Sequence, residues 1–338
     1  MNRALAVEIA GTGSALPSRV VGTAELVAEA FPGSPPEQRA RVETKSGIVT
    51  RHWLEPGEAA LPLGVAALRG ALERAGIEAR ALGRIIFVSS TGGDHVVPAN
   101  AHQIAGAFGL SDTCDAFDLS NSCVGFLSAL DVAARSVATG SGPVAIVAVE
   151  TFSRQLSPRG PRAYVVLGDA AAAAVVRPIE GRAADGTGAP GGILASCLRS
   201  VDRLRGKMSM AWAGSPGARP YHDFDARSSE LADSALACIG AAIDDVLQSA
   251  AISLSDVDWV VLHQPNGSLY ALLLDELGID RRRTVNVVRD IGSVGAASVP
   301  FALDRLLRGA TVTAGQRILM ASVGAGTAYG AILYQVPS

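Results

Sequence analysis

The sequence is short of cysteine, and the few cysteines it has form no recognisable metal or disulfide pattern. Its 338 residues include four cysteines and five histidines, none of them at the close spacing of a zinc site. A chain of this length can bury enough apolar surface to fold without disulfide bonds. We therefore expect a reduced, cytoplasmic protein that uses no metal ion.

The sequence also has no apolar run of membrane-spanning length and no strong net charge, and we expect no targeting segment. Asp169 interrupts the apolar stretch 164–176, and the N terminus reads as a short strand and a turn rather than as a signal peptide. The net charge of -3 provides no general attraction to nucleic acid or to an anionic membrane. We therefore expect neither of these among the partners of the protein.

A dinucleotide-binding fingerprint is missing as well, although two glycine-rich segments partly resemble one. The segment "GTGSAL" at 11–16 follows a strand, but Leu16 takes the place of the third glycine and Pro17 follows it. The segment "GAGTAYG" at 324–330 leads into an apolar strand instead of a helix. The sequence therefore predicts no nucleotide cofactor, and we expect no other cofactor.

What the sequence does contain is a regular alternation of apolar strand-like runs and helical stretches. This alternation predicts an α/β protein with parallel strands. The expected strands are residues 84–90, 115–120, 143–150, 258–264, 284–288 and 316–323. The expected helices include residues 63–77 and 231–251.

The two halves of the chain repeat the same order of elements. The triplet Ala-Leu-Asp occurs twice, and Asp304 lies 173 residues after Asp131. Ser90 and His263, each at the end of an expected strand, are also 173 residues apart. Because one offset holds for separate elements, we favour a duplicated α/β unit over a coincidence of α/β rhythm.

The repeat divides the chain into two halves and a connection. We predict a first half at 1–178, connecting and pocket-lining loops at 179–230, and a second half at 231–338. The middle segment is rich in glycine and proline, which is typical of loops.

Cys123 stands where an expected strand gives way to an expected helix. A single cysteine in an apolar context is usually a small core residue, and that is the alternative interpretation. At a helix start, however, free N–H groups and the helix dipole favour the thiolate, which is a nucleophile. His263 ends a strand of the second half, where reactive groups collect, and a histidine nearby can exchange the proton.

Six motifs, spread over nearly the whole chain, resemble the β-ketoacyl-acyl-carrier-protein synthase III family of the thiolase superfamily. They are "GTGSALP" (11–17), "SNSCVGF" (120–126), "GDAAAAAVV" (168–176), "VLHQPN" (261–266), "GAASVPFALD" (295–304) and "GAGTAYG" (324–330). The resemblance implies a thiolase-like α/β fold, in which duplicated halves form a five-layer αβαβα arrangement. It also implies a homodimer that handles acyl thioesters.

The resemblance implies a role for individual residues. Cys123 takes the place of the acylated nucleophile, and His263 that of the catalytic histidine. The backbone N–H groups of Cys123 and Ala325 take the places of the two oxyanion donors. Asn266 ends the histidine motif and is expected to contact substrate. Val97 takes the place of an aromatic residue that reaches across the dimer to the substrate.

Ser293 is a departure from the family pattern, because it stands at the position of the catalytic asparagine. In the family, the asparagine and the histidine hold the carbonyl of a malonyl thioester while carbon dioxide leaves. A serine hydroxyl is shorter and offers one donor in place of an amide NH₂, and losing one such donor typically costs about 10²–10³ in rate. The alternative role of Ser293 is to cap the helix that begins nearby.

Acyl transfer to a hydroxyl, an amine or a thiol needs no enolate. We therefore expect an acyltransferase of secondary metabolism, such as polyketide or antibiotic biosynthesis. It would load an acyl group from coenzyme A or a carrier protein onto Cys123. It would then pass the group to a carrier protein, or to a hydroxyl or amine of a natural product, without decarboxylation.

Two other functions remain open. One is a decarboxylative condensing enzyme in which Ser293 or a water replaces the amide. The other is a silent partner subunit, against which the presence of both Cys123 and His263 argues. The acyl donor also remains open. Arg41 takes the place of the family's tryptophan that stacks on the adenine of coenzyme A. Ser268, Asp275 and Glu276 take the places of basic residues that often contact the carrier protein in the family.

Overall fold

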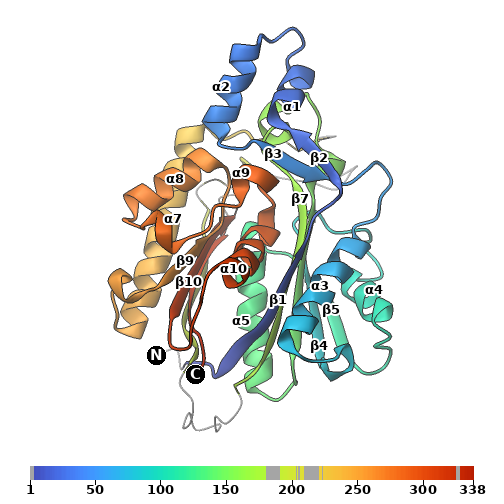
Figure 1. The fold of residues 1–338 in the computed structure, drawn as a ribbon, viewed down its shortest axis with the longest axis vertical. Helices are drawn as coiled ribbons and strands as arrows, with labels where there is room; N and C mark the ends of the chain where they lie inside the picture. The colour runs from blue at the N-terminus through green and yellow to red at the C-terminus, as the bar shows by residue number, and fades with distance from the viewer. Residues whose placement is uncertain are drawn as a thin grey trace.

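Two β-sheets form the centre of the computed structural model (Figure 1). The structure describes residues 4–179, 191–202, 204, 206–208, 221–222, 224–324 and 328–338. The strands are β1 (Val7–Ala15), β2 (Arg19–Gly22), β3 (Thr50–Trp53), β4 (Arg84–Val88), β5 (Asp115–Leu119), β6 (Val144–Thr151), β7 (Asp169–Pro178), β8 (Gly192–Ser200), β9 (Trp259–Leu262), β10 (Arg317–Gly324) and β11 (Ala328–Gln335).

Helices lie between the sheets and on their outer faces. They are α1 (Thr23–Ala30), α2 (Pro36–Ser46), α3 (Leu61–Ala75), α4 (Asn100–Ala107), α5 (Gly125–Ala138), α6 (Pro161–Tyr164), α7 (Ser228–Ala250), α8 (Gly267–Glu276), α9 (Val288–Ile291) and α10 (Ser298–Gly309). The short 3-10 helices η2 (Ser122–Val124) and η6 (Gly295–Ala297) precede α5 and α10.

The layers follow from three hydrophobic clusters. The first cluster joins α3 and α4 to the outer face of the first sheet, the second surrounds α5 and α10 between the sheets, and the third joins α7 and α8 to the second sheet. Figure 1 shows the resulting order of helix, sheet, helix, sheet and helix. Glycines on β1 allow α3 to pack closely, because a Cβ on Gly11 would lie 2.2 Å from the carbonyl oxygen of Ala71.

The two sheets have matching strand orders. The five-stranded sheet runs β1-β7-β6-β4-β5, and the four-stranded sheet runs β8-β11-β10-β9. In the first sheet, β1 pairs with β7 and β7 with β6 in antiparallel fashion, and β6 pairs with β4 in parallel. In the second sheet, β8 pairs with β11 and β11 with β10 in antiparallel fashion, and β10 pairs with β9 in parallel. The repeat inferred from the sequence is therefore a repeat of structure.

The repeated aspartates have equivalent places on the two central helices. Asp304 of α10 is fully buried and accepts hydrogen bonds from Thr12 Oγ1 (2.9 Å) and Ser14 Oγ (2.6 Å) of β1. Asp131 of α5 accepts one from Ser196 Oγ (2.9 Å) of β8. Each aspartate thus binds the first strand of the other half, which joins the two halves by polar contacts as well as by the central core.

Two expectations about secondary structure are wrong. Residues 284–288 form no strand, because the Gln264 side chain forms hydrogen bonds with their backbone groups. Its Nε2 donates to the carbonyl oxygen of Val285 (2.7 Å), and its Oε1 accepts from the N–H groups of Val287 and Val288 (2.9 Å each). These groups are then not free to pair with another strand.

The range 179–230, expected to consist of loops, contains β8. This strand pairs with β11 and forms an edge of the second sheet, so the second sheet begins before residue 231. The half boundaries at 178 and 231 stay a prediction. Within the described residues, no helix has both the length and the apolar character needed to cross a bilayer.

Candidate active site

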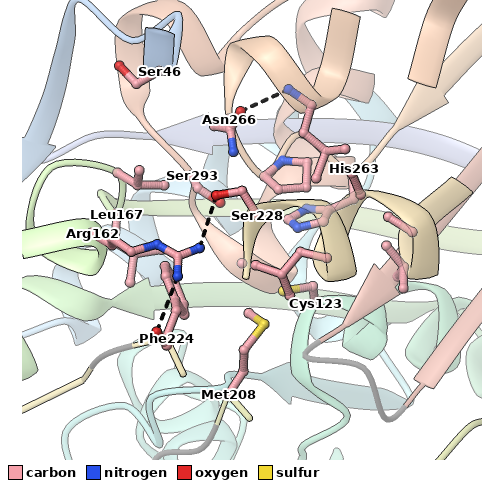
Figure 2. Close-up of a pocket in the computed structure, with 18 of the residues that line it drawn as sticks. Ser46, Cys123, Arg162, Leu167, Met208, Phe224, Ser228, His263, Asn266 and Ser293 are labelled. Carbon is pink, nitrogen blue, oxygen red and sulfur yellow. Dashed lines mark hydrogen bonds between the residues drawn. The ribbon is translucent and has the colours of Figure 1, made fainter. Parts of the chain in front are cut away.

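A cavity of about 810 Å³ lies between the two halves of the chain. It brings together four residues singled out in the sequence, namely Cys123, His263, Ser293 and Asn266. Figure 2 shows these side chains around one space, with Arg162 and Phe224 on its border. The described residues that line the cavity include no aspartate or glutamate.

Cys123 lies in η2, one turn before α5. Ser122 has a φ of 49°, in the left-handed region, and this turn directs the chain from β5 into the helix. From the second half, Ser322 Oγ donates to the carbonyl oxygen of Cys123 (2.8 Å). Gly324 packs so closely that a Cβ there would lie 3.0 Å from the Cys123 nitrogen. The position of the sulfur is therefore fixed by both halves of the chain.

His263 follows β9 directly and is 3% exposed. Its N–H donates to the carbonyl oxygen of Ala321 (2.8 Å), which continues the pairing of β9 with β10 beyond the strand end. Its Nδ1 has no hydrogen-bond partner in the described part of the chain. Burial lowers the pKa of His263 to about 4, so the ring is a neutral base at physiological pH.

The thiol of Cys123 is also neutral in the resting protein. Burial and then the nearby carboxylate of Glu150 raise the pKa of Cys123 to about 12. The hydrogen bond from Ser122 acts in the opposite direction. The helix start favours a thiolate, but burial and Glu150 outweigh it here. A thiolate at this position therefore forms when a base removes the proton.

Glu150 is a residue that the sequence reasoning missed. It is the last residue but one of β6, is fully buried, and accepts hydrogen bonds from the N–H groups of Ser90 (3.0 Å), Thr91 (3.2 Å) and Ala296 (2.9 Å). Ser90 Oγ donates to it as well (2.6 Å). Glu150 thus joins the loop after β4 to η6, and both segments border the cavity. A charged residue ending an otherwise apolar strand was the signal in the sequence.

Ser293 is held in the cavity by its backbone alone. Its N–H donates to the carbonyl oxygen of Val166 (2.9 Å), and its carbonyl oxygen accepts from the N–H of Gly168 (2.9 Å). Its hydroxyl forms no hydrogen bond with any described residue, and Ser293 lines the cavity. The helix-cap alternative is wrong, because the residue at the N-cap of α10 is Ala297.

The other predicted site residues have different positions. Asn266 lines the cavity and caps α8, since its Oδ1 accepts from the N–H of Leu269 (2.9 Å). Val97 is 85% exposed and does not line the cavity of its own chain within the described residues. Ala325 lies outside the described residues. Its neighbour Gly324 is the residue that packs on Cys123.

Helices α2 and α8 form the mouth of the cavity. Lys45 and Ser46 of α2 and Ser268 of α8 line it, and Ser268 Oγ donates to the carbonyl oxygen of Lys45. The two helices meet at Gly47 and Gly267, where a Cβ on either glycine would lie 2.7 Å from the other's Cα. This close contact holds α2 over the start of α8.

Comparison with known proteins identifies the family. Residues 117–189 match the family model described as 3-oxoacyl-[acyl-carrier-protein (ACP)] synthase III, and residues 247–336 match the model of its C-terminal part. The chain is 34% identical over 335 residues to a β-ketoacyl-[acyl-carrier-protein] synthase III of Streptomyces coelicolor, which covers 98% of this chain and 97% of that protein. The chain belongs to the 3-oxoacyl-[acyl-carrier-protein] synthase III family.

Solved structures of related enzymes share the fold. The priming β-ketosynthase of the R1128 polyketide pathway superimposes with a TM-score of 0.85 at 30% identity, covering 100% of this chain and 98% of that one. Synthase III of Aquifex aeolicus also has a TM-score of 0.85, at 26% identity, covering 97% of this chain and 99% of that one. The thiolase-like fold with duplicated halves is therefore confirmed.

Proposed function

We propose that this synthase III family member is an acyltransferase that does not decarboxylate its substrates. It takes an acyl group from a thioester onto Cys123 and passes it to a nucleophilic acceptor. Support comes from the cavity, which contains a half-buried thiol and a neutral imidazole but, among its described lining residues, no carboxylate. The priming ketosynthase at 30% identity supports a place in secondary metabolism.

The observation that carries the proposal is the hydroxyl of Ser293 in the cavity. Decarboxylation builds an enolate oxyanion that needs two strong donors, and beside His263 the second donor is here a serine hydroxyl, which is shorter than the asparagine side chain and offers one O–H in place of an amide NH₂. The Gln264 amide does not take over this role, because both its nitrogen and its oxygen bind the backbone at 285–288.

The proposed reaction proceeds in two transfers. First, the Cys123 thiol gives its proton to His263, and its sulfur attacks the carbonyl carbon of the donor thioester. The donor's carbon–sulfur bond breaks, and the leaving thiol takes the proton from His263. In the second transfer, His263 takes a proton from the acceptor, and the acceptor attacks the acyl carbon. The bond to Cys123 breaks, and the proton returns to its sulfur.

The backbone N–H of Cys123 is proposed to bind the oxyanion in both transfers, together with that of Ala325. Loss of such a donor typically costs about 10²–10³ in rate. Neither N–H depends on residue 293, so the change from asparagine to serine leaves this part of the site intact. The donor is proposed to be coenzyme A or a carrier protein, because the named relatives act with an acyl carrier protein.

A matched set of variants tests the proposal. Intact-protein mass is measured after incubation with a panel of acyl-coenzyme A thioesters. Wild type and Ser293→Asn should gain the acyl mass, and Cys123→Ala should not. Single-turnover transfer from the loaded enzyme should fall by about 10²–10⁴ in His263→Ala. An acyl mass on Cys123→Ala would contradict the assignment of the nucleophile.

Decarboxylative condensation is the alternative, and the names of the relatives favour it. Wild-type enzyme loaded at Cys123 is given a malonyl thioester, and carbon dioxide and ketoacyl product are measured together. We expect neither from wild type, and weak release from Ser293→Asn. Efficient condensation by wild type would replace the acyltransferase proposal with this alternative.

A further inference from the structure

The cavity contains a charge that its described lining does not neutralise. Two cations line it, Lys45 of α2 and Arg162 of α6, and none of the described lining residues is an aspartate or a glutamate. Lys45 is exposed, whereas Arg162 is half-buried. Arg162 forms no ion pair with any described residue, since its contacts are two carbonyl oxygens, a hydroxyl and an aromatic ring. Burying an unpaired charge is unfavourable, so a bound anion would stabilise Arg162.

The strong contacts of Arg162 use one nitrogen of its guanidinium. Nη1 donates to the carbonyl oxygens of Phe224 (3.3 Å) and Ala226 (2.6 Å), and Cζ lies 5.8 Å from the centre of the Phe224 ring. Nη2 reaches Ser228 Oγ only at 3.5 Å, the outer limit of a hydrogen bond, and Nε has no partner among the described residues. Figure 2 shows the guanidinium between Phe224 and Ser228. The edge formed by Nε and Nη2 therefore keeps donors for another group.

Three other arginines of this chain use the same edge to bind a carboxylate. In each, Nε and Nη2 both donate to one aspartate, at distances from 2.6 to 3.2 Å. The pairs are Arg135 with Asp131, Arg199 with Asp245, and Arg282 with Asp280. The planar fork of arginine matches the two oxygens of a carboxylate. Arg162 has the same donors, but the described residues give it no carboxylate.

A purely structural role accounts for only part of this arrangement. Holding residues 224–226 against α6 takes the two hydrogen bonds of Nη1. Those bonds need neither Nε nor the charge, and a neutral glutamine has an amide NH₂ that can donate in the same way. The remaining donors belong to a residue that lines the cavity, so a bound substrate can use them.

From this arrangement we infer that Arg162 is an anion-binding residue of the cavity, and that a substrate of this site carries a carboxylate that binds Nε and Nη2. The inference rests on the proposed function, because it names a chemical feature of the same reactants. The carboxylate belongs either to the acyl group loaded onto Cys123 or to the acceptor.

The inferred carboxylate takes no part in bond making or breaking. It stays on the product, which distinguishes it from the carboxylate of a malonyl thioester, lost as carbon dioxide in condensation. A charged group held away from the reacting carbonyl orients the substrate, because the two oxygens bind a planar fork in one direction. Arg162 is therefore a residue of specificity and not of the chemical step.

Binding is tested on the unloaded wild-type protein with adipamate and adipamide. Both chains have an amide at one end, and the other end is a carboxylate in adipamate and a second amide in adipamide. Dissociation constants come from saturation-transfer NMR. We expect adipamate to bind at least about tenfold more tightly, on the scale of a charge-assisted hydrogen bond. Equal binding of the two compounds would overturn the inference.

Arg162→Gln removes the charge and keeps an amide donor for the backbone at 224–226. It should abolish the preference for adipamate and leave adipamide binding unchanged. Arg162→Lys keeps a charge without the planar fork, so the preference should fall at least about threefold, and this variant decides the test if Arg162→Gln unfolds. Arg159→Gln is the matched control. Arg159 lies 5.0 Å from the ring centre of Tyr221, is exposed and does not line the cavity, so the preference should persist.

Lys45→Gln separates the two cations of the lining. A preference that survives the changes at Arg162, or that is lost in Lys45→Gln instead, would overturn the inference, because the carboxylate would then bind elsewhere. A preference lost equally in Arg159→Gln would also overturn it, since general attraction rather than the fork of Arg162 would be the cause. None of these outcomes depends on acyl transfer, so they leave the proposed function standing.

Two reaction arms distinguish the sources of the carboxylate. Loading of Cys123 is followed by protein mass with adipyl and adipamoyl thioesters of N-acetylcysteamine, a thiol without phosphate groups. Faster loading by adipyl, lost in Arg162→Gln, assigns the carboxylate to the acyl group. Discharge of acetyl-loaded enzyme is followed with 6-hydroxyhexanoate and 6-hydroxyhexanamide. Faster discharge by the acid, lost in the same variant, assigns it to the acceptor.

The outcomes separate this inference from the proposed function. Loading and discharge that proceed equally with the acids and the amides would overturn the inference and keep the acyltransferase. Formation of ketoacyl product from a malonyl thioester, with no discharge by any hydroxyl compound, would overturn the proposed function. Cys123 is loaded in that case too, so the adipyl arm still decides the role of Arg162.

Discussion

At the scale of single residues, the protonation of Cys123 is the property most open to experiment. Its pKa is raised to about 12, so the thiolate fraction should grow about tenfold with each pH unit from 7 to 10. Alkylation by iodoacetamide, followed by peptide mass mapping, should show this rise without a plateau. Free glutathione is the reference. A plateau below pH 9 would contradict the neutral thiol.

Glu150 should control this reactivity through its charge. Burial raises the pKa of Glu150, whereas hydrogen bonds from Ser90, Ala296 and Thr91 favour its ionised form, and the charge of that form raises the pKa of Cys123. Glu150→Gln should therefore speed alkylation of Cys123 at pH 7 by roughly tenfold, as expected for one charge inside a protein. It should also destabilise the fold by about 1–3 kcal/mol, since an amide NH₂ faces donors.

Asp169→Asn provides the matched control for Glu150→Gln. Asp169 is an equally buried carboxylate that accepts from Leu54 (2.8 Å) and Ser153 (2.9 Å). Asp169 is not among the groups that shift the pKa of Cys123. A similar loss of stability with unchanged alkylation is expected. Equal acceleration in both variants would mean that loosening of the fold, rather than the charge of Glu150, exposes the thiol.

Ser293 should matter for chemistry and little for stability. Its hydroxyl has no hydrogen bond to a described residue, so Ser293→Ala should change the free energy of unfolding by less than about 0.5 kcal/mol. Urea denaturation measures this. A loss near 1 kcal/mol, the usual cost of removing a helix cap, would show a structural role for the hydroxyl after all.

At the scale of elements, the loop before α4 presents a rigid apolar pair. Asn100 Oδ1 accepts from the N–H groups of Asp94 (2.9 Å) and His95 (3.2 Å), while Val96 and Val97 are 67% and 85% exposed. We propose that Val97 reaches the acyl site of a partner subunit. Val97→Phe should then restrict loading to shorter acyl groups, measured by protein mass with thioesters from acetyl to octanoyl. Val96→Phe is the control.

At the scale of the whole molecule, we propose a homodimer, in which this loop is buried. Sedimentation at micromolar concentration should give about twice the 34.5 kDa of the chain. Val97→Asp should shift the equilibrium toward monomer, because burying an unpaired charge is costly. A wild-type protein that sediments as a monomer would rule out any role of Val97 in a partner's site.

The sequence by itself determined the elements whose signals are local. Strand and helix periodicity, the Ala-Leu-Asp repeat and the motifs around Cys123 and His263 predicted the fold and the residues that meet in the cavity. Such signals are readable because each depends on a few consecutive residues. The predicted strand at 284–288 failed because the competing partner, Gln264, lies 20 residues earlier.

Only the tertiary structure decided the environment of those residues. The neutral thiol of Cys123 follows from burial and from Glu150, which arrives on another strand. The free hydroxyl of Ser293 follows from backbone bonds to Val166 and Gly168 of the first half. The cavity wall joins Phe152 to His222, which lies 70 positions later in the chain. Desolvation and charge act through space, so they depend on which segments fold together rather than on which residues are neighbours in the chain.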